Sequence, residues 1–304
     1  MSKNRGVPIS DARGNVTSET RTVSGQAYAV AYLYNLADQV VQVTYPSGRI
    51  VLYGRDAQGR ITGVTTKQNA AAASVNVATP INYQPMSRLV QQLWYGNGLN
   101  DWNTYTLDHA IEVLGVYDGA TNVVNRAHGR TDNLNITNIW DNVNTANTLN
   151  LWYHASNRLQ NADGPWGAKT YYHDGVGNRT HEITTVGAST TTDVYGYPGS
   201  SNRVSNVVRN GATTTRAFTY DGAGNILTDN RSGTTTTYTY NNRNRLETAT
   251  SGALVWGYTY NAREQLVARN LNVGGVSLTH FVHDIFGNVI AETNGTAAGT
   301  TREY

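Results

Sequence analysis

The chain contains no cysteine, so disulfide bonds and thiol chemistry are excluded from its stability and its function. Charged residues make up 14% of the 304 residues, the net charge is +2 and there is no basic run. A nucleic-acid surface or an anionic-membrane surface is therefore not indicated. No stretch approaches the roughly 20 apolar residues of a membrane span, and the first residues lack the apolar segment of a secretory signal peptide.

Phenylalanine is also scarce, with 3 residues against 20 tyrosines, and the hydrophobic fraction is 39%. A chain of this composition must use tyrosine on buried faces where other proteins use aliphatic residues. The phenol ring buries a large apolar area, and its hydroxyl can still reach water or a partner. We therefore expect a fold in which tyrosine rings pack while their hydroxyl groups stay accessible to a polar group.

One short motif recurs along the chain at intervals of 20 to 24 residues wherever its copies are clear. In the copy YDGAGNIL, an aromatic anchor is followed by Asp or Asn, three residues later by a residue that tolerates positive φ, and then by an aliphatic residue. Weaker copies place Ser10, Tyr34 and Arg55 at the anchor. The structural repeat anchors that we identify, with their turn residues, are Tyr153, His173, Tyr197, Tyr220, Asp221, Gly224, Tyr240, Asn244, Tyr260, His283 and Gly287.

Each position of the motif has a physical reason. A second aromatic residue usually precedes the anchor by two positions, which places both rings on one face of a strand. Asp or Asn at the first turn position and Gly at the fourth are typical of a type I turn, and a left-handed residue after it completes a hairpin with a bulge. The sequence thus predicts an all-β protein of repeated antiparallel hairpins in a curved, spiralling sheet, with about ten or more units.

The repeats are predicted to fill residues 1–304 and to be most regular at 153–304. We expect an irregular insertion near 106–150, with helical or irregular structure around residues 144–150. A second insertion near 69–80, which is rich in alanine, is predicted to be the tip of a hairpin.

The repeat, seen best in YDGAGNILTDNRSGTTTTYTYNNRNRLETA, resembles the RHS/YD-repeat family over almost the whole chain. The resemblance implies part of a β-cocoon, a spiral shell that encloses a toxic C-terminal polypeptide, as in bacterial polymorphic toxins, with relatives in ABC toxin shells and teneurins. It implies a secreted or extracellular protein whose partner is its own C-terminal toxin domain or another polypeptide cargo. The core-associated and toxin regions of the family are expected to be absent from this sequence. The expected role is non-enzymatic enclosure.

The same motif contains glycine, acidic and histidine residues, which can also serve phosphate binding, calcium binding or acid–base chemistry. Gly222 and Gly224 lack the third glycine and the helix of a phosphate-binding loop. A calcium site needs six to eight oxygen ligands, whereas each turn supplies one acidic residue. The pairs His173–Asp174 and His283–Asp284 suggest acid–base chemistry, but neighbouring strand residues point to opposite faces. The sequence therefore predicts no catalytic, cofactor or metal site.

A second function class remains open, an extracellular adhesion module that binds a glycan or a cell-surface protein through exposed Tyr and Trp. Trp166, in the turn DGPWG, is the candidate surface-binding residue. Unpaired strand edges would also allow edge-to-edge self-association.

Overall fold

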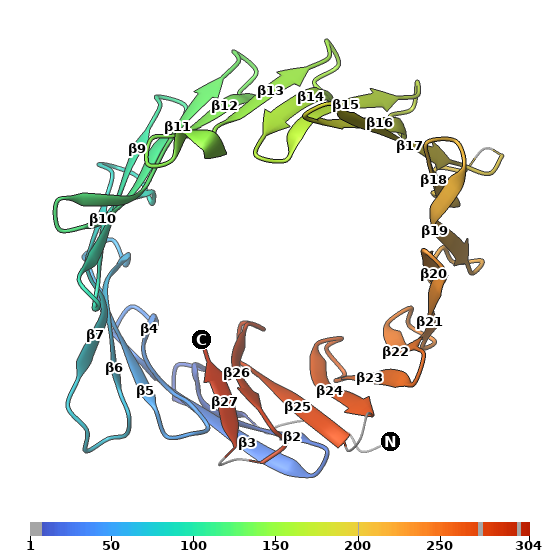
Figure 1. Cartoon of the computed structure of the whole chain (residues 1–304). Coiled ribbons are helices and arrows are strands. Elements are labelled where there is room, and N and C mark those ends of the chain that lie inside the picture. The colour runs from blue at the N-terminus through green and yellow to red at the C-terminus, as the bar shows by residue number, and fades with distance from the viewer. Residues whose placement is uncertain (1–7, 200, 273–275, 297–298) are drawn as a thin grey trace. The chain divides into compact units, whose positions relative to one another are not determined.

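The computed structural model describes residues 8–199, 201–272, 276–296 and 299–304. Within them the chain forms 27 β-strands and one short 3-10 helix, η1 (Thr145–Asn147), so the prediction of an all-β protein is confirmed (Figure 1). Most strands that follow one another in the chain pair antiparallel, as β19 (Thr213–Tyr220) does with β20 (Ile226–Arg231). The chain divides into two compact units, residues 1–80 with 236–304 and residues 81–235.

The first unit contains hairpins from both ends of the chain. Its N-terminal strands are β1 (Pro8–Ser10), β2 (Val16–Val23), β3 (Gln26–Tyr34), β4 (Val40–Thr44), β5 (Ile50–Arg55), β6 (Ile61–Lys67) and most of β7 (Val75–Tyr83). Its C-terminal strands are most of β21 (Thr234–Tyr240), then β22 (Leu246–Ser251), β23 (Leu254–Tyr260), β24 (Leu266–Asn272), β25 (Val276–His283), β26 (Val289–Thr293) and β27 (Thr300–Glu303).

The second unit is a run of hairpins from the middle of the chain. Its strands are β8 (Val90–Tyr95), β9 (Leu99–Tyr105), β10 (Ile111–Asp118), β11 (Thr121–Arg130), β12 (Ile136–Asp141), β13 (Leu149–Tyr153), β14 (Leu159–Gly164), β15 (Gly167–His173), β16 (Arg179–Val186), β17 (Ser189–Gly196), β18 (Asn206–Arg209), β19 (Thr213–Tyr220) and β20 (Ile226–Arg231).

The hairpin β19–β20 shows why the motif folds in this way. Tyr220 pairs with Ile226 across the turn, and the register shifts by one residue beside it, which is the bulge that the motif predicts. The backbone N–H of Gly224 donates to the carbonyl of Asp221 at 3.1 Å, closing the turn. Gly224 has φ +95°, a conformation that L side chains rarely adopt, so the fourth turn position favours glycine.

The stretch 106–150, where the sequence predicts an irregular insertion, contains the strands β10, β11 and β12. The turns before β10 and β12 begin with Thr106 and Thr131, whose hydroxyls accept from Ala110 N and Asn135 N, each at 3.2 Å. Threonine thus takes the place of Asp, and His109 and Leu134 replace glycine with φ of 60° and 61°. The turn geometry of the motif is preserved although the residue types differ. Near 144–150 the predicted irregular element is present as η1.

The predicted hairpin tip at 69–80 is shorter than expected. Val75 already begins β7, whose Asn76 and Ala78 pair with Thr65 and Val64 of β6. The tip itself is closed by the Asn69 side-chain oxygen, which accepts from the backbone N–H groups of Ala71 and Ala72 at 3.0 Å. Alanine in this segment therefore marks a turn, and the β-branched residues after it return to the sheet.

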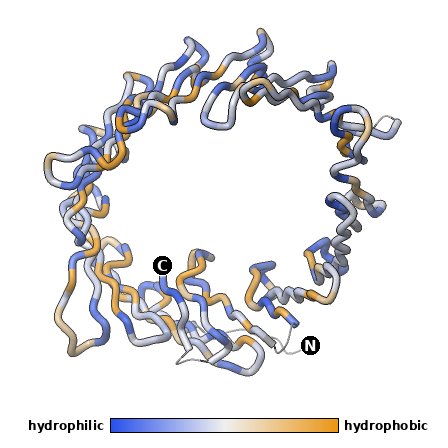
Figure 2. Tube along the Cα trace, viewed as in Figure 1, coloured by the Kyte–Doolittle hydropathy of each residue, from blue (hydrophilic) through white to orange (hydrophobic). Residues whose placement is uncertain are grey.

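Every hairpin has two faces, and we call the face that bears the anchor residue the anchor face and the other the opposite face. In β3, Tyr28, Val30 and Tyr32 of the anchor face are at most 2% exposed, whereas Leu33 of the opposite face is 54% exposed. Figure 2 shows hydrophilic and hydrophobic residues interspersed along the chain. A period of two is what a sheet with one buried face requires.

Candidate functional site

The anchor tyrosines connect each hairpin to the one before it. Their hydroxyls donate to the carbonyl of the first residue after the preceding turn, at 2.7–2.9 Å. The pairs are Tyr34 with Val16, Tyr105 with Val90, Tyr153 with Ile136, Tyr197 with Arg179, and Tyr220 with Val204. Arg55 and Arg130 occupy the anchor in two other units and donate to the equivalent carbonyls, those of Val40 and Ile111. This bond needs a side-chain donor, so the anchor position favours tyrosine over phenylalanine.

The other predicted anchors lie at equivalent places. Tyr240 and Tyr260 end their strands opposite Leu246 and Leu266, and His173 and His283 stand opposite Arg179 and Val289. The turn residues share the left-handed conformation, with φ of 58° at Asn244 and 95° at Gly287. These residues are therefore brought together as a repeated connection between strands, and not as one compact site.

Both carboxylate oxygens of each acidic turn residue accept hydrogen bonds from donors within the same turn. Asp221 Oδ1 accepts from the backbone N–H of Asn225, and its Oδ2 accepts from the Asn225 side-chain amide, both at 2.8 Å. The Asn225 amide accordingly holds the pKa of Asp221 below its usual value. Asp174 and Asp284 are bound in the same way by Asn178 and Asn288. These oxygens are engaged in the turn, which weighs against a cation at the motif.

The aspartate that follows His173 or His283 is bound by its own turn and not by the histidine. Both oxygens of Asp174 and of Asp284 accept from donors of the turn, so neither aspartate orients His173 or His283 as in a catalytic dyad. Among the described residues there is no group of three or more His, Cys, Asp or Glu side chains that could hold a metal ion.

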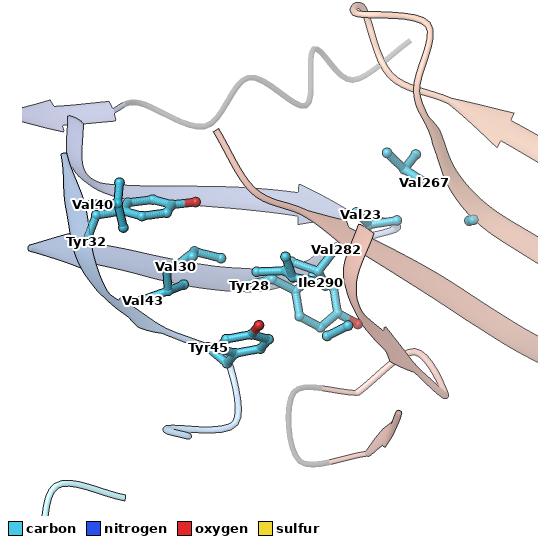
Figure 3. Packing of buried hydrophobic residues seen from close by; sticks show 12 residues of the cluster. Val23, Tyr28, Val30, Tyr32, Val40, Val43, Tyr45, Val267, Val282 and Ile290 are labelled. Carbon is cyan, nitrogen blue, oxygen red and sulfur yellow. The ribbon is translucent and has the colours of Figure 1, made fainter. Parts of the chain in front are cut away.

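In the first unit, the last strands of the chain lie on its first strands, and we call this contact the overlap. Its core joins residues of β2–β4 and the turn after β4 to residues of β24–β26 (Figure 3). The buried hydrophobic residues are Val23, Tyr28, Val30, Tyr32, Val40, Val43, Tyr45, Val267, Ala268, Val282, Ile290 and Ala291. Figure 1 shows the two groups of strands side by side within this unit.

The two layers of the overlap present different faces to each other. Tyr28 belongs to the anchor face of β3, whereas its contacts His280 and Thr293 belong to the opposite face of β25 and β26. The sheet is therefore stacked on itself, anchor face against opposite face. In the units of β19–β22 the opposite face carries the hydrogen-bonded pairs Thr219–Thr228 and Thr239–Thr248. Ala268 takes the place of that second threonine in the overlap, which lets the layers approach.

Polar groups cross the overlap at several points. The Tyr28 hydroxyl lies 2.8 Å from both His280 Nδ1 and Thr293 Oγ1, and all three side chains are nearly fully buried. The Tyr32 hydroxyl accepts from the backbone N–H of Ile285 at 3.0 Å. Arg21 donates to the carbonyl of Asp284 at 3.0 Å and pairs with the buried Glu19 at 2.8 Å. The Tyr45 hydroxyl donates to the carbonyl of Tyr304 at 2.6 Å.

Burial shifts the titration of these groups. It raises the pKa of Tyr32 and raises that of Tyr45 to about 12, so both phenols stay protonated. It lowers the pKa of His280, and it lowers the pKa of His283 with help from the positive charge of Arg21. His280 Nε2 and His283 Nδ1 are buried without a hydrogen-bond partner among the described residues. Both histidines are therefore neutral in the folded protein at neutral pH.

An open groove of about 530 Å³ borders the overlap. Val51, Tyr53, Val64 and Val77 of β5–β7 lie on one side of it, and the residues of β27 through Tyr304 lie on the other. Among the described residues there is no helix long and apolar enough to cross a membrane.

Trp166 lies in the turn between β14 and β15 and is 41% exposed. It is not distinguished by exposure, because four further tryptophans of the second unit are comparably exposed: Trp94 at 39%, Trp102 at 42%, Trp140 at 43% and Trp152 at 47%. Their strand partners place these four on the opposite face, where Asn100, Asn138, Asn150 and Asn161 also lie.

The overlap is the feature that the sequence analysis missed. Its contacts join residues about 250 positions apart, such as Tyr28 and His280, and no local pattern reveals such a contact. A signal was nevertheless present, because apolar residues such as Ala268, Val282 and Ala291 replace the threonine and asparagine that the opposite face carries elsewhere.

Residues 11–50 and 34–71 match the sequence model of the RHS Repeat family. This part of the chain is thus built of RHS repeats, and the resemblance seen in the sequence is confirmed for residues 11–71. No curated protein matches the chain in sequence.

Solved structures share the fold. The Tc holotoxin pore of Photorhabdus luminescens is 12% identical with a TM-score of 0.61 over 97% of this chain, and the TcdB2-TccC3 complex is 12% identical with a TM-score of 0.59 over 95%. The matches cover 19% and 20% of those chains, so this chain spans about a fifth of their length.

Proposed function

We propose that the chain is a non-catalytic wall segment of a secreted RHS-type shell that encloses or carries a polypeptide. The observation that carries the proposal is the overlap. The chain leaves the first unit at Pro80 and returns to it at Thr236, and buried polar and apolar contacts then fix its last strands onto its first. The hairpins of residues 81–235 are thereby held at both ends, as a wall requires. Residues 1–304 would then form one run of repeats, as the sequence predicts.

The similar structures support a polypeptide as the partner. One is described as TcdB2-TccC3-Cdc42, and another as TcdB2-TccC3 without its hypervariable C-terminal region. Each description thus names a further polypeptide, Cdc42 or a C-terminal region, in connection with the TcdB2-TccC3 complex. In the present chain, the hydrogen-bonded threonine pairs on the opposite face of β19–β22 would offer a polypeptide a polar surface.

Protease protection tests this function. An unfolded, protease-sensitive reporter is fused after Tyr304, and its cleavage is compared with that of the free reporter. We expect cleavage to slow by roughly tenfold or more, since enclosure lowers the access of the protease. A fusion carrying Arg21→Ala, which weakens the overlap, should lose the protection. Equal cleavage of the fused and free reporters would refute the proposal.

A glycan-binding adhesion module is the second candidate, and the four exposed tryptophans of the opposite face favour it. Tryptophan beside asparagine amides, such as Trp152 opposite Asn161, offers a stacking surface with hydrogen-bonding groups. Binding to a glycan array that is lost in both Trp152→Ala and Trp140→Ala would support this candidate. Absence of any glycan signal in the unsubstituted protein would count against it.

A further inference from the structure

Two histidines of one strand lie inside the overlap. His280 and His283 of β25 are 1% and 5% exposed, and among the described residues no other histidine is buried to this extent. His280 contacts Tyr28 of β3, and His283 lies close enough to Arg21 of β2 to be affected by its charge. Histidine is the side chain whose ordinary pKa lies between pH 5 and 8. The contact between the two layers therefore contains groups that can gain a charge at mildly acidic pH.

The surroundings of His280 do not accommodate a charged ring. Its Nδ1 lies 2.8 Å from the Tyr28 hydroxyl, and its Nε2 is buried without a hydrogen-bond partner among the described residues. The side chains that face it are Tyr28 of β3, Thr293 of β26 and Ala268 of β24, and none of these residue types carries a negative charge at neutral pH. A protonated imidazole donates from both nitrogens. Its Nε2–H group would then be buried without an acceptor, which costs free energy while the layers are in contact.

His283 lies near a positive charge. Arg21 donates to the carbonyl of Asp284, the residue after His283, at 3.0 Å. Burial and then the charge of Arg21 lower the pKa of His283, and the Asp284 carboxylate, which acts in the opposite direction, is the smallest influence. The carboxylates nearby are engaged with other donors, Glu19 with Arg21 and Asp284 with its own turn. Tyr32 of β3 faces the same turn through its neutral hydroxyl. A charged His283 would therefore have no counter-ion of its own.

Separation of the layers would return both histidines to water, where their pKa values are near 6.5. In the closed contact both pKa values are lowered by burial. The separated state thus binds protons first as the pH falls below 6.5, and its population rises. Between pH 7.5 and 5.0 the gain is at most about thirtyfold for each histidine. The pairing of β25 with β26 and of β2 with β3 is made by backbone groups, so the hairpins can persist when the layers separate.

We infer that the overlap is an acid-sensitive contact, in which protonation of His280 and His283 releases β25 and β26 from β2 and β3 while each hairpin stays paired. Under the proposed shell function, such a contact would allow acid to open the wall segment. The release itself is measured without an enclosed polypeptide. Its failure therefore leaves reporter protection untouched, and a failure of reporter protection leaves the release untouched.

The absence of cysteine allows a single introduced thiol to report on the contact. Val282→Cys places the thiol in the overlap core of Figure 3, where Val282 is 2% exposed, and Val207→Cys places a reference in the second unit, where Val207 is 8% exposed. A pyridyl disulfide reagent, which reacts with thiols at acidic and neutral pH, labels each full-length variant at pH 7.5 and 5.0. The ratio of the two labelling rates removes the pH dependence of the reagent. We expect the rate at Val282→Cys, relative to Val207→Cys, to rise at least about tenfold at pH 5.0.

Histidine variants assign the response to its groups. His280→Gln and His283→Gln together should hold the rise below about threefold, because glutamine is polar but does not titrate. His128→Gln is the matched control, since burial also lowers the pKa of His128 on β11 in the second unit, and the tenfold rise should remain. If the double variant is labelled rapidly already at pH 7.5, each single glutamine variant should still remove part of the pH response.

Three results would overturn the inference. One is a ratio that does not change between pH 7.5 and 5.0, with neither thiol labelled faster in acid. Another is an equal acceleration at both thiols, which would indicate that acid unfolds the whole chain. The third is a full response in the double glutamine variant, which would assign the transition to a carboxylate such as Glu19 instead of the histidines.

Discussion

Replacing Tyr220 with phenylalanine removes one hydroxyl group and keeps the ring. The lost bond joins the phenol to the carbonyl of Val204 at 2.7 Å, and both residues are half-buried. The net value of such a bond is about 1 kcal/mol, and the unpaired carbonyl can add to the cost where water does not reach it. We therefore expect the free energy of unfolding of this hairpin to fall by about 1 kcal/mol.

The loss should be local, because each unit of a repeat array is stabilised by its neighbours. Native-state hydrogen exchange measures it directly: amides of β18–β20 should exchange about fivefold faster in Tyr220→Phe, the factor that corresponds to about 1 kcal/mol. Amides of β2 and β3 should be unchanged.

Tyr238→Phe is the matched control. Tyr238 lies on the anchor face two residues before Tyr240, and its hydroxyl has no hydrogen-bond partner among the described residues. Its replacement should change the free energy of unfolding by less than about 0.5 kcal/mol. Equal effects of Tyr220→Phe and Tyr238→Phe would refute the reasoning that the phenol–carbonyl bond connects the units.

Three further perturbations test other parts of the account. Gly224→Val should lower the free energy of unfolding by roughly 1–3 kcal/mol in urea titration, because φ is +95° and a Cβ would lie 2.5 Å from Arg203 Nη2. Gly222→Val is the control and should be nearly neutral, because a Cβ there has no atom within 4 Å. The free energy of unfolding should fall as pH drops below 6.5, because His280 and His283 have lowered pKa values in the folded state and the unfolded chain binds the protons first. The slope is at most about 1.4 kcal/mol per pH unit for each histidine. His280→Gln should reduce this slope. A flat profile between pH 7 and 5 would contradict the burial of these rings. Arg21→Ala should cost about 3–5 kcal/mol by calorimetry, because it leaves the buried Glu19 carboxylate unpaired; a loss below about 1 kcal/mol would place Glu19 in water instead.

The hairpins could be predicted from the sequence because their determinants are local. One unit contains an aromatic anchor, an Asp or Asn, a positive-φ residue and an aliphatic residue within about ten positions. The geometry of the strand or the turn explains the residue type at each of these positions. The sequence predicts that the tyrosine hydroxyls reach water or a polar group, but it does not identify the acceptor. The acceptor is a backbone carbonyl, which no residue type encodes. The turns at Thr106 and Thr131 were missed because threonine performs the role of aspartate there.

The overlap could not be predicted by the same reasoning. Whether Ala268 and Val282 meet the N-terminal strands depends on the path of the intervening hairpins, which is the sum of many small twists. The exposure of Trp166 was expected from its turn, but the comparable exposure of Trp140 and Trp152 follows from their place on the opposite face, which requires the strand register.

The central claim is that the two ends of the chain are joined by a buried polar and aromatic core, and a double-mutant cycle between Tyr28→Phe and Thr293→Val tests it most directly. The two side chains are 265 positions apart, and their oxygens lie 2.8 Å from each other. We predict a coupling free energy of about 1–2 kcal/mol in urea unfolding. Additive effects of the two substitutions, with a coupling indistinguishable from zero, would contradict the account.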